Sequence, residues 1–131
     1  MAKLWELYEQ KPILDKFEFA LLLKNGTPFD RGATPHQDVS AVIKLRNGLL
    51  HFKPEWFSKQ EEHAKLCELL KHKANLSPFF PTSEPLFPRG WTSHATVKWA
   101  IQSVLTFVLE FEERAMVKQR MAKIREKFNA L

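Results

Sequence analysis

The chain has 131 residues and a hydrophobic fraction of 44%, which supplies enough apolar surface for one packed core and leaves little for a second. We therefore predict a single domain over residues 1–131. The formal charge of +5 permits a polyanionic partner such as RNA, but a charge of this size is also an ordinary surface charge and does not require one.

The sequence contains a single cysteine, Cys67, so an internal disulfide is excluded and a reducing compartment fits. The first ten residues carry charges throughout and are not followed by the apolar stretch of a secretory signal. The longest apolar runs, residues 19–23 and 104–109, are far too short to cross a bilayer. These features predict a cytoplasmic protein with no membrane partner.

The first predicted helical region covers residues 2–24 and is interrupted at Pro12, which should lie in the first turn of a second segment. Asn25 and Gly26 end this region, and we expect Gly26 to take the left-handed cap conformation. A loop over residues 27–33 follows. Within the second segment, apolar side chains recur at helical spacing; they are Ile13, Leu14, Phe17, Leu21 and Leu22.

The next helix is expected to begin at Thr34, a good N-cap residue, with Pro35 in its first helical position. It should end near His51 or Phe52, because Pro54 disfavours helical geometry in the residue before it. Apolar residues at steps of three and four form one stripe along it, which should face the core. The stripe comprises Val39, Val42, Leu45, Leu49 and Phe52.

A third helix is predicted over residues 55–73, and segment 75–91 follows it. That segment holds four prolines, which prevent a regular helix, and four aromatic side chains, which indicate a packed loop rather than a disordered linker. The side chains of the third helix expected to face inward are Phe57, Ala64, Cys67 and either Leu69 or Leu70.

The last helix is predicted to run from about residue 92 to residue 129 as one long element. Its apolar residues alternate steps of four and three, a heptad-like seam suited to bundle packing or to a dimer. No segment alternates as a β-strand would, so we predict an all-α helical bundle. The seam comprises Val97, Ile101, Val104, Val108, Phe111 and Ala115.

The segment that can carry chemistry is residues 46–51, RNGLLH. Asn47 and His51 are four positions apart and share a helix face, and the long Arg46 side chain can reach the same region. An imidazole can give or take a proton near neutral pH, and a guanidinium can bind a phosphate and stabilise its developing charge. These groups suit RNA cleavage in which a ribose 2′-OH attacks the adjacent phosphate. No carboxylates cluster at ligand spacing, so neither a metal nor a cofactor is predicted.

On these residues the chain resembles the HEPN superfamily, small α-helical domains marked by an Arg, an adjacent polar residue, and a His a few positions later. The match is Arg46, Asn47 and His51 at the end of an amphipathic helix, with the apolar VIKL before the motif and an aromatic residue after it. The resemblance implies a four-helix bundle closed by a long C-terminal helix. It also implies a metal-independent endoribonuclease of toxin–antitoxin or other defence systems, and a homodimer in which the motifs of two copies meet in one cleft.

The resemblance implies catalytic roles for three residues: acid–base work for His51, phosphate binding for Arg46, and support for Asn47. A subset of HEPN toxins has a tyrosine, modified by a nucleotidyltransferase partner, at the position of Lys53, so that regulation is not expected here. Lys53 and Arg89 are instead predicted to contact the RNA substrate. An antitoxin or another protein partner is a further expectation.

Other functions stay open at this stage. Some HEPN members lack nuclease activity, and the alternative is a non-catalytic helical module that binds RNA or a protein partner. A third reading is a helical assembly protein that uses the C-terminal seam, and exposure of that seam would favour it. For Arg46 and His51 themselves, the structural alternatives are a surface arginine and a histidine that caps the helix C-terminus.

The remaining candidate side chains are better explained structurally. His63 and Cys67 are four positions apart, but His72 lies off their face and a structural zinc site usually needs four ligands, so surface histidines and a core cysteine are expected. His94 should be solvated in the first turn of the last helix. The cations of the C-terminal tail should form a solvated helix face; they are Lys118, Arg120, Lys123, Arg125 and Lys127.

Overall fold

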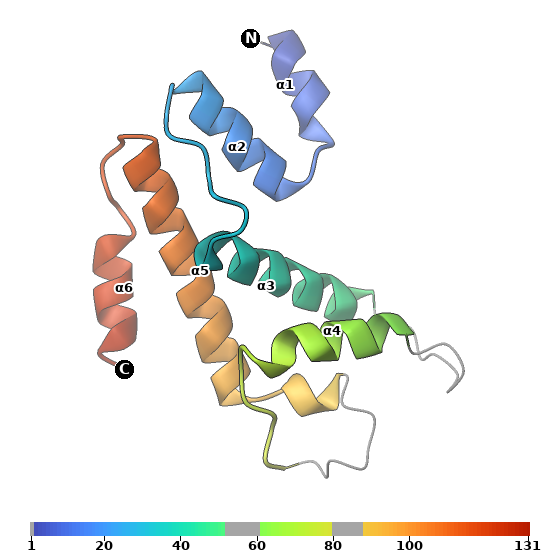
Figure 1. The fold of residues 1–131 in the computed structure, drawn as a ribbon. Helices are drawn as coiled ribbons and strands as arrows, with labels where there is room; N and C mark the ends of the chain where they lie inside the picture. The colour runs from blue at the N-terminus through green and yellow to red at the C-terminus, as the bar shows by residue number, and fades with distance from the viewer. Residues whose placement is uncertain (1, 52–60, 80–87) are drawn as a thin grey trace. The chain divides into compact units, whose positions relative to one another are not determined.

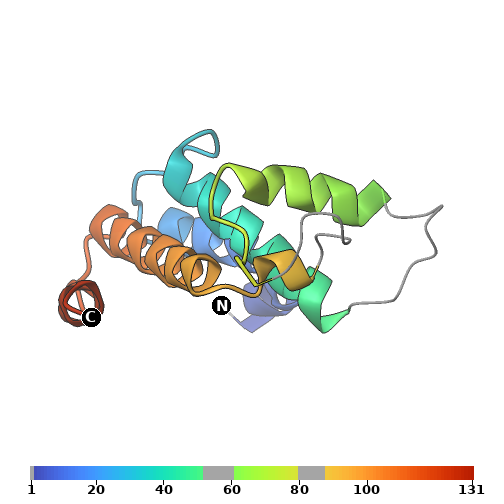
Figure 2. The same ribbon diagram turned by 90° about the horizontal axis from the view of Figure 1, so that it is seen from below.

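The structure, a computed structural model, describes residues 2–51, 61–79 and 88–131. The regular elements in these stretches are all helices and no β-strand is among them, which confirms the predicted all-α class (Figures 1 and 2). None of the helices in them is long and apolar enough to cross a membrane. The elements are α1 (Ala2–Glu9), α2 (Ile13–Leu23), α3 (Thr34–Leu50), α4 (Glu61–Lys71), the 3-10 helix η2 (Arg89–Trp91), α5 (His94–Arg114) and α6 (Ala122–Asn129).

The chain divides into two compact units. Unit 1 comprises Met1–His36 and Leu105–Leu131, and unit 2 comprises Gln37–Val104. The boundary falls inside α3 and inside α5, so both helices supply residues to both units. The single domain expected over residues 1–131 stays a prediction.

Aromatic rings form the centre of unit 1. Phe17 of α2 meets Phe107 and Phe111 of α5 edge to face, with ring centroids 5.2 and 4.8 Å apart. Phe29, from the loop between α2 and α3, stacks on Phe107 with a centroid distance of 4.7 Å. Each such pair stabilises a core by about 0.5–1.5 kcal/mol beyond simple burial. These contacts hold α2 and the loop against the C-terminal half of α5.

The residue that ends α2 in a left-handed conformation is Asn25, with a φ of 52°, and not Gly26 as predicted. The N–H of Gly26 donates to the carbonyl of Leu21, and the N–H of Asn25 donates to that of Leu22, which is a Schellman motif. Asparagine visits this conformation more readily than most residues. Gly26 serves a different purpose, because a Cβ at this position would lie 2.5 Å from the carbonyl oxygen of Arg114.

The predicted helix over residues 92–129 is interrupted, because α5 ends at Arg114 and α6 begins at Ala122. Met116 takes a left-handed conformation with a φ of 54°, and the N–H of Val117 donates to the carbonyl of Glu112. Glycine or asparagine usually fills this position, so a methionine leaves no sign of the break in the sequence. A non-glycine residue in this conformation costs roughly 1–2 kcal/mol, which other contacts must offset.

The side chain of Glu112 supplies one such contact. It is buried, and its carboxylate accepts hydrogen bonds from the backbone N–H groups of Arg120, at 3.1 and 3.2 Å, and Met121, at 3.4 Å. These N–H groups lie at the entry to α6, where a helix has no backbone partners of its own. Glu112 therefore caps α6 from α5, in the position where a helix N-terminus favours a negative charge.

The core of unit 2 joins α3, α4, η2 and the first half of α5. Leu45, Leu70 and Trp91 are buried at its centre. Partly buried side chains surround them; these are Leu66, Cys67, Ala74 and Trp99.

The prediction that Ala64 faces inward from α4 is wrong, because Ala64 is exposed. The face is centred on Leu70, and Ala64 lies about 120° around the helix from it, whereas Leu66 and Cys67 lie close to that centre. Phe57, which was also expected to face inward, lies outside the described residues.

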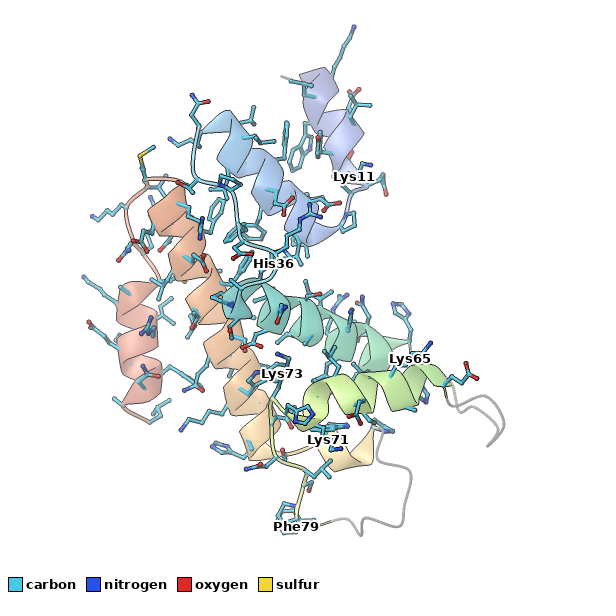
Figure 3. The ribbon with its side chains drawn as sticks, in the orientation of Figure 1. Lys11, His36, Lys65, Lys71, Lys73 and Phe79 are labelled. Carbon is cyan, nitrogen blue, oxygen red and sulfur yellow. The ribbon has the colours of Figure 1, made fainter. Side chains whose placement is uncertain are left out.

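The two described ends of the proline-rich segment meet within unit 2. The N–H of Ser77 donates to the carbonyl of Gly90 at 2.7 Å, and Trp91 is buried. Phe79 is 86% exposed, so this aromatic ring does not cover the core (Figure 3). Residues 80–87 lie outside the described part of the chain.

The predicted seam of the last helix is buried only toward its C-terminal end. Ala115 is buried, but Val97, Ile101 and Val104 are 57, 38 and 42% exposed. In the first half of α5 the buried face instead carries Thr96 and Ser103, together with the partly buried Trp99.

The buried hydroxyl groups on α5 are satisfied locally. Ser103 Oγ donates to the carbonyl of Trp99 at 2.8 Å, and the hydroxyls of Thr96 and Ser93 lie 2.9 Å apart. Ser93 Oγ also accepts from the N–H of Thr96 at 3.1 Å, so it caps α5 close to the predicted start. A hydroxyl with a hydrogen-bond partner can be buried at little cost, and the spacing of apolar residues alone does not reveal this.

We expect Gly26→Ala to lower the free energy of unfolding by about 1–3 kcal/mol, because the new methyl group would overlap the Arg114 carbonyl. Gly32→Ala is the matched control. Its Cβ would meet only Asp30 Oδ1, at 3.3 Å, on an exposed loop. Urea denaturation followed by circular dichroism measures both, and equal stability of the two variants would contradict the prediction.

Candidate functional site

The three residues of the RNGLLH segment expected to act in catalysis lie at the C-terminal end of α3. Arg46 and Asn47 lie in its last two turns, and His51 follows directly after the helix. The N–H of His51 donates to the carbonyl of Asn47 at 2.9 Å, which keeps the helical spacing to the end of the segment. All three side chains are exposed.

Burial of Leu45 sets which way this end of α3 faces. Leu45 is 6% exposed in the core of unit 2, so Arg46 and Asn47, one and two positions further on, turn toward solvent. The predicted apolar stripe is no longer buried beyond Leu45, because Leu49 is 45% exposed and Leu50 is 61% exposed. Phe52, the last residue of that stripe, lies outside the described residues. The site thus combines polar side chains with two exposed leucines.

Arg46 and Asn47 contact each other directly. Arg46 Nη1 donates to Asn47 Oδ1 at 3.0 Å. The guanidinium keeps its other N–H donors, and the amide nitrogen of Asn47 keeps both of its own. In the described part of the chain no carboxylate pairs with Arg46. Arg46 and Asn47 can therefore present several donors to an anion such as a phosphate.

Two further residues, Lys53 and Arg89, were expected to contact the substrate. Lys53 lies outside the described residues. Arg89 lies within the proline-rich segment, where it begins η2. His94 is exposed in the first turn of α5, as expected.

The described stretches contain no group of three or more His, Cys, Asp or Glu side chains that could hold a metal ion. Cys67 is half-buried in the core of unit 2, where its Sγ accepts a hydrogen bond from Trp91 Nε1 at 3.3 Å. Burial raises the pKa of the Cys67 thiol, and the hydrogen bond from Trp91 opposes this only in part. The thiol is therefore an inert packing group and a poor nucleophile.

Sequence reasoning missed a cluster of polar side chains in unit 1, formed by Glu18, Arg31 and His36 at the start of α3. His36 is labelled in Figure 3. Arg31 Nε and Nη2 donate to the two carboxylate oxygens of Glu18 at 2.9 and 2.6 Å, and His36 Nε2 lies 4.0 Å from Glu18 Oε1. The hydrogen bonds and charge of Arg31 hold the pKa of Glu18 below its usual value, against the opposing effect of burial. These residues come from three separate elements, so no spacing in the sequence reveals them.

This cluster has the geometry of a structural tie. Its carboxylate accepts two hydrogen bonds from the bidentate arginine, which favours the ionised form and makes it a poor acceptor of a proton from a substrate. The His36 ring lies against Phe29 and Phe107, with centroids 6.2 and 6.3 Å away. The cluster therefore links α2, the loop and the first turn of α3 within unit 1. In unit 2, a half-buried ion pair between Lys73 and Asp38 links α3 to the end of α4 in the same way.

A polar groove of about 770 Å³ lies between α5 and α6 in unit 1. Both carboxylates and guanidinium groups line it, and nothing in the sequence predicted it. Its lining residues are Thr27, Thr106, Leu109, Glu110, Glu113, Arg114, Gln119, Ala122, Arg125, Glu126 and Asn129.

Comparison of the chain with protein-family models, with curated proteins and with solved structures found no match.

We expect Arg46→Ala, Asn47→Ala and His51→Ala each to change the free energy of unfolding by less than about 0.5 kcal/mol, because exposed side chains away from the core contribute little to stability. Leu45→Ala, one position from Arg46 but buried, should cost about 2–5 kcal/mol. Urea denaturation of the four variants checks both statements. A loss as large as that of Leu45→Ala in any of the other three would show that its side chain is structural.

Proposed function

We propose that this chain is a HEPN-type, metal-independent endoribonuclease whose catalytic residues are Arg46, Asn47 and His51. The observation that carries the proposal is the placement of these side chains together at one exposed helix end, with Arg46 bonded to Asn47 and not neutralised by a carboxylate in the described stretches. A structural arginine usually has a carboxylate partner or packs its stem. Arg31 and Arg114 of this chain pair with carboxylates, whereas Arg46, like Arg120 and Arg125, has no carboxylate partner among the described residues.

In the proposed reaction, the ribose 2′-OH attacks the adjacent phosphorus and the bond from phosphorus to the 5′ oxygen breaks. The products are a 2′,3′-cyclic phosphate and a 5′-OH end. One imidazole accepts the proton of the 2′-OH, and another donates a proton to the leaving oxygen. Arg46 binds the phosphate oxygens and stabilises the charge that develops on them. Asn47 holds the Arg46 guanidinium through its Oδ1 atom.

One copy of the chain supplies a single His51, whereas the reaction uses a base and an acid. We therefore propose a homodimer in which two copies of the α3 end meet across a two-fold axis. The exposed Leu49 and Leu50 beside the motif give this interface an apolar surface. A cytoplasmic location, an RNA contact from Lys53 and Arg89, an antitoxin partner and a role in defence belong to the same proposal.

The exposed row on α5 favours a second candidate function. Val97, Ile101 and Val104 lie at steps of four and three and are all exposed. A row of this kind suits a helical module that assembles with a protein partner rather than cutting RNA.

RNA cleavage distinguishes the two functions. In the presence of EDTA, we expect the wild-type chain to cut a mixed pool of single-stranded and structured RNA and to leave 2′,3′-cyclic phosphate ends. His51→Ala should lower the rate by about 10²–10⁴-fold, the usual contribution of a general acid or base. Arg46→Ala should lower it by about 10²–10³-fold, the usual cost of removing one group that stabilises developing charge. His72→Ala removes another exposed histidine and should cut at the wild-type rate. If the wild-type chain leaves the RNA intact, or if all variants cut it at the same rate, the proposed catalytic roles are wrong.

The dimer is tested separately. Leu50→Glu places a charge on the proposed interface, so we expect it to convert a wild-type dimer to a monomer and to abolish cleavage. Leu22→Glu is the control, since Leu22 of α2 is similarly exposed, at 68%, and lies far from the motif in sequence. Sedimentation equilibrium gives the oligomeric state of each. A wild-type monomer that still cuts RNA would exclude the two-copy site.

A further inference from the structure

Residues 118–131 concentrate positive charge. They contain five cationic side chains and one acidic one, Glu126. All five cations are exposed, and in the described part of the chain none of them pairs with a carboxylate. Elsewhere in unit 1 the arginines Arg31 and Arg114 are held in ion pairs. The cations of this segment are therefore available to an external anion.

The fold holds this segment in place and gives it two different faces. The carboxylate of Glu112 accepts hydrogen bonds from backbone N–H groups at the entry to α6, which fixes the start of the segment. Lys123 and Lys127 are four positions apart and share one face of α6. Arg125 and Glu126 lie on the other side, where they line the groove toward α5.

The groove itself is unsuited to a polyanion. Arg114 is already bonded to Glu110, and Arg125 shares the groove with the carboxylates of Glu113 and Glu126. Those carboxylates repel a phosphate, whereas Lys123 and Lys127 do not line the groove, and α6 holds no acidic residue besides Glu126. An extended polyanion would therefore bind along the face that carries Lys123 and Lys127.

We propose that Lys118, Lys123 and Lys127 bind the phosphate backbone of single-stranded RNA, so that α6 is a second RNA contact besides the α3 end. This inference rests on the proposed function, which identifies RNA as the polyanion. An anionic membrane fits less well, because a membrane-bound helix inserts several large apolar side chains. On α6 the one such side chain that is exposed is Ile124, at 50%.

The test compares two triple variants in a His51→Ala background, which prevents cleavage. Lys118, Lys123 and Lys127 are changed to Gln in one, and the exposed Lys3, Lys11 and Lys24 of the same unit in the other, so that net charge is equal. Binding of a fluorescein-labelled 20-nucleotide oligouridine is measured by anisotropy over a range of salt concentrations. Each phosphate contact adds about 0.7 to the slope of log affinity against log salt, so the slope should fall by about 2 in the first variant. It should stay unchanged in the second.

Equal slopes in the two variants would overturn the proposal, as would an absence of RNA binding by the parent protein. Loss of binding to phosphatidylserine vesicles in the first variant, with RNA binding unchanged, would overturn it in favour of a membrane. Failure of the proposed nuclease is a separate result, since it is read from intact RNA with the wild-type chain and leaves the salt slopes as they are.

Discussion

Both cores of this protein are built on α5. Its C-terminal half carries Phe107 and Phe111 into the aromatic cluster of unit 1, and its N-terminal half carries Trp99 against the core of unit 2. Arg114, its last residue, donates from Nη1 to the carbonyl of Pro28 at 2.6 Å and lies over the Phe29 ring. A single heptad-like stripe therefore does not describe the burial of α5, whose buried residues in unit 2 include Thr96 and Ser103.

The ends of the helices follow from this packing. The carbonyl of Arg114 approaches the turn after α2 so closely that position 26 must lack a side chain. The residue in the left-handed conformation at this turn is Asn25. At the end of α5, Met116 takes the same left-handed conformation, although glycine or asparagine normally fills this position. The buried carboxylate of Glu112 offsets that strain by pairing the N–H groups at the entry to α6. Local strain is thus accepted where tertiary contacts compensate for it.

The charged side chains of the chain fall into two kinds. One kind is paired and links elements of the same unit: Glu18 pairs with Arg31 in unit 1, and Asp38 pairs with Lys73 in unit 2. Arg46 and the cations of the C-terminal tail have no such partners in the described stretches and face solvent. Desolvation accounts for the pairing of Glu18, Asp38 and Lys73, because a partly buried charge is costly unless it is paired, whereas an exposed charge needs no partner. The unpaired cations are consequently the ones to which we assign binding of phosphate.

The sequence by itself determined the helical class, the breaks at Pro12 and after Leu23, the start of α3 and the grouping of Arg46, Asn47 and His51 at its end. These depend on proline geometry, capping residues and helical spacing, which act over a few residues. The tertiary structure alone decided that α5 stops at Arg114, that Thr96 and Ser103 face inward in place of Val97 and Val104, and that Glu18, Arg31 and His36 meet. Each of those depends on a partner distant in sequence, which satisfies a hydroxyl, a carboxylate or a strained turn, and local patterns hold no information about it.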